Sequence, residues 1–480
     1  MQGMTKHIYL EAQQCLTRGW YARMLPAELP DETQEFRMEQ GNEVHRLSRE
    51  LFPDGILVKG GNAVEKTRRL MADTNVSILF EAAFSNDGYA TRADIIVRDG
   101  NGWKVMEVKS NLHDPEVPDE LIDDQAYTVM VMKRSGVQIT SCSLLRLSRD
   151  FRKGMGIDRM FGETETTAAV QQRVQELSPR WNEILDATAR SQPPEPTLSK
   201  ACKDCDYFSD TCLGKGIEYS VMQLPRCQAK QIAALQQIGI LDLRKLPGNF
   251  YFTDGQRTVV RCVKTDEPFF APGLKALLDS IQLPAYYLDF ETVTTSLPLY
   301  SDIAPYEQVV TQYSIHRCSA PGQVDQHFEY LGDPLRDCQK ELAERLIQDL
   351  GEKGSIIVYH TFEQSRINDL AKRFPDLALS LSLISSRLFD LCKVIRRGCY
   401  HPEFYGSYSI KNVLPALVPD MSYDGLEIAD GGAAIVKYAK MALGRYTMAE
   451  CQAIRQNLLR YCGQDTLAMV RLHKVLLDRC

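Results

Sequence analysis

Residues 89–109, YATRADIIVRDGNGWKVMEVK, decide the fold of the N-terminal half. They contain two β-rich runs, 89–97 and 103–109, and the turn sequence RDGNG between them is typical of a hairpin. A third β-rich run, 76–84, precedes them. Helical patterns lie on both sides of these strands, so this half is predicted to be an α/β domain.

The second strand of this hairpin carries a glutamate and a lysine two residues apart, Glu107 and Lys109. Side chains two apart on a strand face the same side, so both are predicted to project together. Met106 and Val108 are then expected to pack on the opposite face, and Asp94 to lie beside the pair on the first strand. Two carboxylates can hold Mg²⁺ or Mn²⁺ against a phosphate, and a neighbouring lysine can stabilise the charge that develops there.

Two further residues are candidates for this site. His45, in a helical stretch upstream, is a candidate metal ligand, although an ordinary surface histidine fits the local sequence equally well. Gln125 lies in a helix predicted at 119–133. A helix, a hairpin with Asp…Glu-x-Lys and a helix with glutamine resemble the PD-(D/E)xK core of RecB-like nucleases, which implies catalytic roles for the lysine and for Gln125. That family usually has tyrosine four residues after the glutamine; here Val129 stands there, and the tyrosine is Tyr127.

The fourteen cysteines are not expected to form disulfides, because the cytoplasm keeps thiols reduced. Three of them are closely spaced in the segment KACKDCDYFSDTC: Cys202, Cys205 and Cys212. A metal site needs a fourth ligand, and Cys15 is the preferred candidate, with a histidine, Asp206 and Cys227 as alternatives. One cysteine before the core and three after it resemble the iron–sulfur site of RecB-like nucleases, which implies a [4Fe–4S] cluster. Four thiolates also suit Zn²⁺, which is the alternative metal.

A second acidic site is predicted in the C-terminal half. The sequence AYYLDFET at 285–292 is a short apolar strand that ends in Asp289 and Glu291, whose carboxylates share one face. In a helix expected near the C-terminus, Tyr461 and Asp465 are four residues apart and also share a face. Paired carboxylates of this kind bind two divalent ions for in-line phosphoryl displacement, and the tyrosine hydroxyl can hydrogen-bond the attacking water.

The sequence IIVYHTFE at 356–363 connects these two motifs, with an apolar strand followed by Glu363 at the start of a helix. This order resembles the DnaQ-like 3′–5′ exonucleases of the DEDD type, in the tyrosine variant. The resemblance implies that Glu363 is a metal-binding carboxylate. Aspartate is normal at that position, and Asp369 is the alternative residue. Asp390 resembles a later segment of the same fold, and Lys411 is a candidate phosphate contact.

The whole chain resembles a prokaryotic family that joins a RecB-like nuclease half to a DnaQ-like exonuclease half. This resemblance implies an α/β fold, with an N-terminal PD-(D/E)xK restriction-endonuclease-like domain and a C-terminal RNase H-like domain built on a mixed sheet. We predict a nuclease domain with the cysteine cluster at 1–215, a helical connector at 216–280 and an exonuclease domain at 281–480.

Composition restricts the function further. The chain is 44% hydrophobic and 25% charged, with no apolar run near the roughly 18 residues of a membrane helix. Its first residues do not resemble a secretory signal, so we expect a cytoplasmic protein without a membrane partner. The net charge of −7 requires local basic patches for nucleic-acid binding. The predicted function is a nuclease acting on DNA with single-stranded ends, with a 3′–5′ exonuclease site in the C-terminal half and a second nuclease site in the N-terminal half.

The sequence also allows two other hypotheses about function. In the first, only one site cuts and the other half is a metal-stabilised nucleic-acid-binding module; the valine at position 129 makes the N-terminal half the candidate for that role. In the second, the protein is a non-enzymatic scaffold. Clustered, mutually repelling carboxylates argue against a scaffold, because burying like charges together costs free energy.

Overall fold

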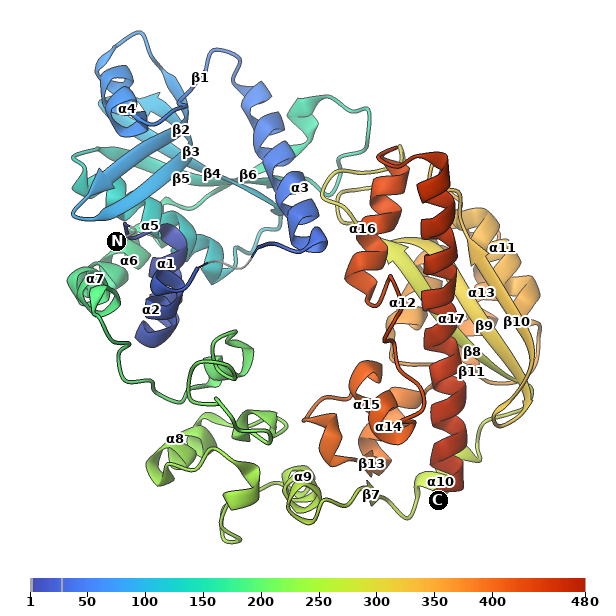
Figure 1. The fold of residues 1–480 in the computed structure, drawn as a ribbon. Helices are drawn as coiled ribbons and strands as arrows, with labels where there is room; N and C mark the ends of the chain where they lie inside the picture. Colours follow the sequence, from blue (N-terminus) through green and yellow to red (C-terminus); the bar gives the residue numbers. More distant parts are fainter. Residues whose placement is uncertain (1–2, 27–28, 480) are drawn as a thin grey trace. The chain divides into compact units, whose positions relative to one another are not determined.

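The structure is a computed structural model that describes residues 3–26 and 29–479. The chain forms two compact units (Figure 1). The first comprises Met1–Leu213 with Thr295–Glu307, and the second comprises Gly214–Thr294 with Gln308–Cys480. Both contain helices packed on a sheet with mixed strand directions, so the predicted α/β fold class is confirmed.

The first unit is built on a six-stranded sheet in sequence order. Its strands are β1 (Ile56–Leu57), β2 (Ile78–Asn86), β3 (Tyr89–Asp99), β4 (Gly102–Leu112), β5 (Ile139–Leu147) and β6 (Phe161–Glu165). The predicted hairpin is β3–β4, and its turn contains Gly100 with a φ of 56°, a conformation that suits glycine. The β1–β2 and β4–β5 pairs are parallel and the others antiparallel.

Seven α-helices belong to this unit as the structure describes it: α1 (Lys6–Gln14), α2 (Leu16–Met24), α3 (Glu32–Ser48), α4 (Ala63–Ala72), α5 (Asp119–Arg134), α6 (Thr167–Leu177) and α7 (Trp181–Ala189). One apolar core joins α1, α5, α6 and α7 to one face of the sheet. A second core lies on the opposite face, where Val44 of α3 packs with Met106 and Val108. The strand alternation predicted for β4 is therefore correct.

The second unit contains a five-stranded sheet in the order β10-β9-β8-β11-β12. Its strands are β8 (Ala285–Val293), β9 (Val309–Ala320), β10 (Gln323–Leu331), β11 (Ile356–Val358) and β12 (Leu388–Asp390). Strand β9 is antiparallel to β8 and β10, whereas β8, β11 and β12 are parallel. A separate pair joins β7 (Phe269–Phe270) to β13 (Cys399–Tyr400).

Ten α-helices complete the second unit as described: α8 (Ala229–Ile238), α9 (Asp254–Thr265), α10 (Leu274–Leu278), α11 (Gln339–Leu350), α12 (Phe362–Arg373), α13 (Ala378–Ser386), α14 (Leu391–Gly398), α15 (Ile410–Leu417), α16 (Gly431–Ala442) and α17 (Met448–Asp478). Helices α11, α12 and α13 pack on one apolar face of the sheet, which includes Tyr286, Leu288 and Phe290 of β8. The alternate residues of β8 face the other way, toward α17, because Tyr287 contacts His473 and Asp289 contacts Cys462 on that helix.

This second face is polar. The Tyr287 hydroxyl lies 2.6 Å from Nδ1 of His473 on α17, and the hydroxyl of Ser314 on β9 lies 2.9 Å from that of Thr466 on α17. A strand face that packs against a helix through hydrogen bonds can also hold carboxylates, which an apolar core excludes. None of the helices among the described residues is both long and apolar enough to cross a bilayer.

Candidate metal centres

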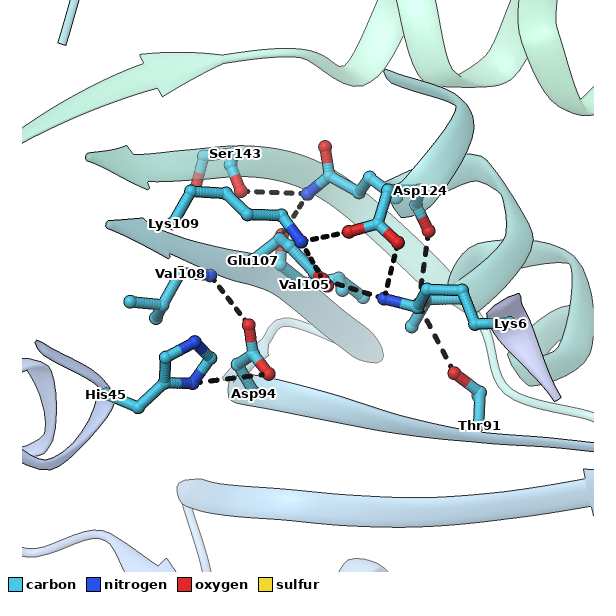
Figure 2. A network of polar contacts seen from close by, with 12 residues as sticks. Lys6, His45, Thr91, Asp94, Val105, Glu107, Val108, Lys109, Asp124 and Ser143 are labelled. Atoms are coloured by element: carbon cyan, nitrogen blue, oxygen red, sulfur yellow. Dashed lines mark hydrogen bonds and ion pairs between the residues drawn. The ribbon is translucent and has the colours of Figure 1, made fainter. Parts of the chain in front are cut away.

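The β3–β4 hairpin brings the predicted residues of the N-terminal site together (Figure 2). Ile95 pairs with Met106, which places Asp94 across from Glu107. The backbone N–H of Val108 donates to Asp94 Oδ2 at 2.8 Å, and Lys109 Nζ lies 3.1 Å from Glu107 Oε1. Nδ1 of His45, near the end of α3, is 3.7 Å from Asp94 Oδ1.

Burial and neighbouring charge set the protonation of this site. Burial and then the charge of Glu107 raise the pKa of Asp94 well above its usual range. Burial alone would also raise the pKa of Glu107, but the ammonium groups of Lys6 and Lys109 lower it to about 2. Burial lowers the pKa of His45, which favours the neutral imidazole that can bind a metal.

Sequence reasoning missed two partners of Glu107. Lys6, the first residue of α1, places Nζ 2.7 Å from Glu107 Oε1 and 3.2 Å from Asp124 Oδ1. Asp124 also pairs with Lys109, so two lysines and two carboxylates form a closed polar network (Figure 2). Asp124 directly precedes Gln125, a predicted site residue, and this position next to Gln125 could have indicated it from the sequence. No sequence pattern could have indicated Lys6, because it lies 101 residues from Glu107 in the chain.

Glu81 on β2 is a further missed residue. Ligand atoms of His45, Glu81 and Asp94 all lie within 4.8 Å of one another, close enough to hold one metal ion. Glu81 has a φ of 55°, an uncommon conformation for a residue other than glycine, at the point where the β2–β3 register skips a pair. Glu107 Oε2 is buried and has no hydrogen-bond partner among the described residues. An unsatisfied carboxylate oxygen beside this group fits a divalent cation.

Gln125 lies beneath this site rather than facing its carboxylates. Its Nε2 donates to the Ser143 carbonyl at 2.8 Å, and its Oε1 accepts from Thr166 Oγ1 at 2.7 Å. The Tyr127 hydroxyl lies 2.9 Å from the carbonyl oxygens of Met4 and Ala90. Both side chains thus hold backbone segments in place, so the contacts of Gln125 favour a positioning role.

The four predicted cysteine ligands line one small cavity in the first unit: Cys15, Cys202, Cys205 and Cys212. Asp206 and Cys227, the alternatives, are not among its lining residues. Cys15 lies between α1 and α2, and α2 is attached to the cysteine segment by a 2.9 Å hydrogen bond from the Tyr21 hydroxyl to the Thr211 carbonyl.

The spacing of these sulfurs bears on the metal. Across the described ranges, no three cysteine sulfurs lie within 4.8 Å of one another. Tetrahedral zinc with Zn–S bonds of about 2.3 Å holds its sulfurs about 3.8 Å apart. Burial raises the pKa of the Cys205 and Cys212 thiols, so a bound cation would be needed to keep them as thiolates.

The C-terminal site forms on the polar face of β8. Asp289, Glu291 and Asp465 have carboxylate oxygens within 4.8 Å of one another. Asp289 and Glu291 are alternate residues of β8, and Asp465 faces them from α17. Cys462 Sγ lies 3.5 Å from Asp289 Oδ2, and the hydroxyl of Tyr423, which the sequence analysis did not identify, donates to Asp465 Oδ1.

Glu363 supplies the fourth carboxylate from the first turn of α12. It is buried, its Oε2 has no partner in the described part of the chain, and its pKa is raised to about 8 by burial and by Asp390 and Asp465. Asp369, the alternative, is exposed and pairs with Arg366 at 2.8 Å. The Asp390 carboxylate accepts from the backbone N–H of Lys393 at 2.8 Å and caps α14.

The C-terminal carboxylates repel one another in a buried setting. Burial and then Asp465 raise the pKa of both Asp289 and Glu291 well above their usual range. Burial raises the pKa of Asp465 to about 6, although hydrogen bonds from Tyr423 and Tyr461 and the charge of Lys411 act in the opposite direction. Four carboxylates with an unsatisfied oxygen fit a divalent cation site, because a bound cation offsets the repulsion.

Comparison with known protein families gives a match within residues 286–409, most of which belong to the second unit. A family described as "Domain of unknown function (DUF2779)" matches residues 286–409, which include Asp289, Glu291 and Glu363. An uncharacterized protein of Mycoplasma genitalium is 22% identical over 286 residues, covering 54% of this chain and 42% of that protein. One from Ureaplasma parvum is 27% identical over 208 residues, covering 38% and 30%. The chain therefore spans less than half the length of either relative.

Among solved structures, the chain is similar to LHK-Exo in its crystal structure in complex with dAMP. The TM-score is 0.23 and the sequence identity 13%, and the match covers 39% of this chain and 89% of that one. At this TM-score the likeness supports no inference about activity.

Proposed function

We propose that the protein is a metal-dependent nuclease with separate sites in its two units. The observation that carries this proposal is the C-terminal site, where the carboxylates of Asp289, Glu291 and Asp465 lie within 4.8 Å of one another and Asp465 raises the pKa of both residues of β8 and of Glu363 on α12. Asp289, Glu291 and Asp465 would hold Mg²⁺ or Mn²⁺, with Glu363 as a further ligand. Divalent ions held there would activate water and neutralise the charge that develops on a phosphate.

The residues around the C-terminal carboxylates have distinct tasks in this proposal. Tyr461 lies one helical turn from Asp465, and its buried hydroxyl, whose pKa burial raises, stays protonated and orients the attacking water. Tyr423 holds Asp465 in place through its hydrogen bond. Lys411, whose charge lowers the pKa of Glu291 and Asp465, would contact the phosphate. The geometry thus supports hydrolysis of a phosphodiester, in the 3′–5′ direction that the DnaQ-like resemblance implies.

The N-terminal site would act as a second nuclease centre. His45, Glu81 and Asp94, whose ligand atoms lie within 4.8 Å of one another, would hold the divalent ion, with Glu107, which the sequence predicted, as a further ligand. Lys109, whose pKa Glu107 and Asp124 raise against the effect of burial, stays charged and would stabilise negative charge on the phosphate. The alternative, a binding module without cleavage, is favoured by one observation: Lys6 and Lys109 already neutralise Glu107, which weakens its demand for a metal.

For the cysteine cavity we propose a [4Fe–4S] cluster with Zn²⁺ as the alternative. No three cysteine sulfurs of the described residues lie within 4.8 Å of one another, which favours the larger cluster over a single zinc ion; the cluster would tie the α1–α2 region to the segment around Cys202. Anaerobically purified protein should be brown and contain about four irons per chain. A colourless protein with one stoichiometric zinc would contradict the cluster. Replacing Cys15 with serine should then abolish the colour, whereas Cys142→Ser, at a buried core cysteine, should leave it unchanged.

The nuclease proposal is tested on single strands labelled at the 3′ or the 5′ end. The full-length protein is incubated with DNA and with RNA, in Mn²⁺ and in EDTA. We expect metal-dependent degradation of DNA with single-stranded ends, with release of the 3′ label first by the C-terminal site. Absence of metal-dependent cleavage on every substrate would reject the proposal.

A further inference from the structure

A groove of about 380 Å³ opens at the carboxyl ends of β11 and β12. Its polar lining includes His360, Thr361, Gln364, Asp390, Lys393 and Arg397. Val358 pairs with Asp390 across the parallel strands, so the chain leaves both strands at the same edge of the sheet. Ligands of open α/β sheets bind in the crevice outside the carboxyl ends of the strands, and the volume is typical of small-ligand sites.

Positive charge in this groove is not neutralised by the protein. Lys393 and Arg397 are exposed and four residues apart on α14, so they share a face. Neither side chain forms an ion pair or a hydrogen bond with any described residue. The one carboxylate in the lining, Asp390, is directed to the backbone of Lys393 as a helix cap. Two cations side by side repel each other, and an anion between them would relieve that repulsion.

His360 connects this groove to the C-terminal site. Its φ of 133° lies in a region that favours glycine, and it stands between β11 and the first turn of α12. The next three residues end in Glu363, so one short segment both lines the groove and places a carboxylate of the C-terminal site. A strand bound in the groove would therefore lie beside the carboxylates.

We propose that this groove binds a backbone phosphate of the same single strand that the C-terminal site cuts, with Lys393 and Arg397 contacting the phosphate oxygens. Guanidinium and ammonium groups bind phosphate irrespective of base sequence. The proposal rests on the proposed function for the identity of the strand. It adds a substrate class, a single-stranded polynucleotide longer than a dinucleotide, because the phosphate held in the groove is not the one that is cleaved.

The experiment separates binding from cleavage. Affinity for a fluorescent single-stranded 20-mer is measured by anisotropy in protein that carries Asp289→Asn and Asp94→Asn, which together suppress cleavage at both proposed sites. We compare the double variant Lys393→Ala/Arg397→Ala with the control Lys230→Ala/Lys353→Ala, which removes two exposed cations from outside the groove. The groove variant should weaken binding about tenfold and reduce the slope of log affinity against log salt by about 0.7, the value for one phosphate of a single strand. The control should change neither.

Cleavage by protein with Asp289 intact and Asp94→Asn gives a second readout, because only the C-terminal site then cuts. The groove variant should raise KM for the 20-mer and leave hydrolysis of the p-nitrophenyl ester of thymidine 5′-monophosphate unchanged, because that ester has no second phosphate. His360→Gly should also raise KM for the 20-mer without lowering Tm, since glycine adopts the observed φ without strain.

The outcomes distinguish the two proposals. Unchanged 20-mer affinity in the groove variant would overturn the groove proposal, whatever the activity. A variant that loses affinity for thymidine 5′-monophosphate but not for the 20-mer would overturn it as well, because the groove would then hold the terminal phosphate of a product. An inactive wild-type enzyme whose 20-mer binding still depends on the two cations would reject the proposed nuclease and support the groove.

Discussion

The two candidate metal centres use similar carboxylates but differ in how many cations of the protein contact them. In the N-terminal site, Lys6 and Lys109 contact Glu107 and bring its pKa down to about 2. In the C-terminal site, Glu363 has a pKa raised to about 8, and Asp289 and Glu291 are raised as well. In the first site the protein's own cations balance Glu107, although burial and Glu107 raise the pKa of Asp94, whereas in the second site the pKa of each of the four carboxylates is raised. The difference predicts that metal ions affect the second unit more strongly than the first.

The largest expected effect is on activity. Asp289→Asn removes a carboxylate from the centre of the C-terminal site and should lower 3′-end release at least about a hundredfold, which corresponds to roughly 2.7 kcal/mol or more. Asp94→Asn should remove a second, separable activity. Both are measured with end-labelled single-stranded DNA in Mn²⁺. Asp369→Asn, at an exposed residue paired with Arg366, is the control and should retain full activity. If Asp94→Asn leaves every activity intact, the N-terminal half is a binding module.

The second prediction concerns stability without metal. Glu107→Gln should destabilise the first unit by about 2–3 kcal/mol, because the amide removes one of the two carboxylates that pair with Lys6 and Lys109 and leaves Asp124 alone against both. Glu363→Gln should stabilise the second unit by about 1–2 kcal/mol, because it removes a carboxylate that its neighbours repel. Hydrogen exchange of β4 and β8 in EDTA measures each unit separately. Changes of the same sign in both variants would contradict the electrostatic contrast.

The smallest effect is a pH dependence of the metal-free protein. The folded-state pKa values of Glu363, about 8, and Asp465, about 6, lie above the ordinary values of 4.5 and 3.8 that apply to the unfolded chain. Between the unfolded and the folded pKa of each group, the native state therefore binds more protons than the unfolded state. Stability of the second unit should therefore be highest near pH 5 and fall by about 1–2 kcal/mol as pH rises to about 8. Saturating Mn²⁺ should flatten this slope and release protons, as thermal scans and calorimetry in two buffers would show. An unchanged slope with metal would place the ion elsewhere.

Strand and helix periodicity made much of the architecture predictable. The predicted runs at 89–97, 103–109 and 285–290 lie within observed strands, and the helix expected at 119–133 lies within α5. Alternation also placed Glu107 with Lys109 and Asp289 with Glu291, because side chains two apart on a strand share a face whatever the tertiary structure. Each of these pairs lies within one strand, so the spacing of residues in the sequence is enough to predict it.

Contacts between distant segments could not be predicted in the same way. Lys6 meets Glu107 across 101 residues, and Tyr423 meets Asp465 across 42. Neither residue belongs to a spaced motif, and each reaches its partner only after the core has formed. Glu81 was missed for a different reason: it lies on β2, outside the Asp…Glu-x-Lys motif, and only the register between β2 and β3 brings it beside Asp94.

Helix α1 connects the N-terminal carboxylate site to the cysteine cavity within the first unit. It begins with Lys6, whose ammonium contacts Glu107, and it ends beside Cys15 at the cysteine cavity. Nine helical residues form a nearly rigid rod about 13 Å long, so a displacement at one end is transmitted to the other. Under the proposal that the cysteines hold a metal cluster, loss of the cluster would free the end of α1 beside Cys15, and Lys6 at the other end would no longer be fixed against Glu107. The charge balance of the N-terminal site would then depend on the cluster, whereas the carboxylates on β8 would depend only on the ion proposed to bind among them.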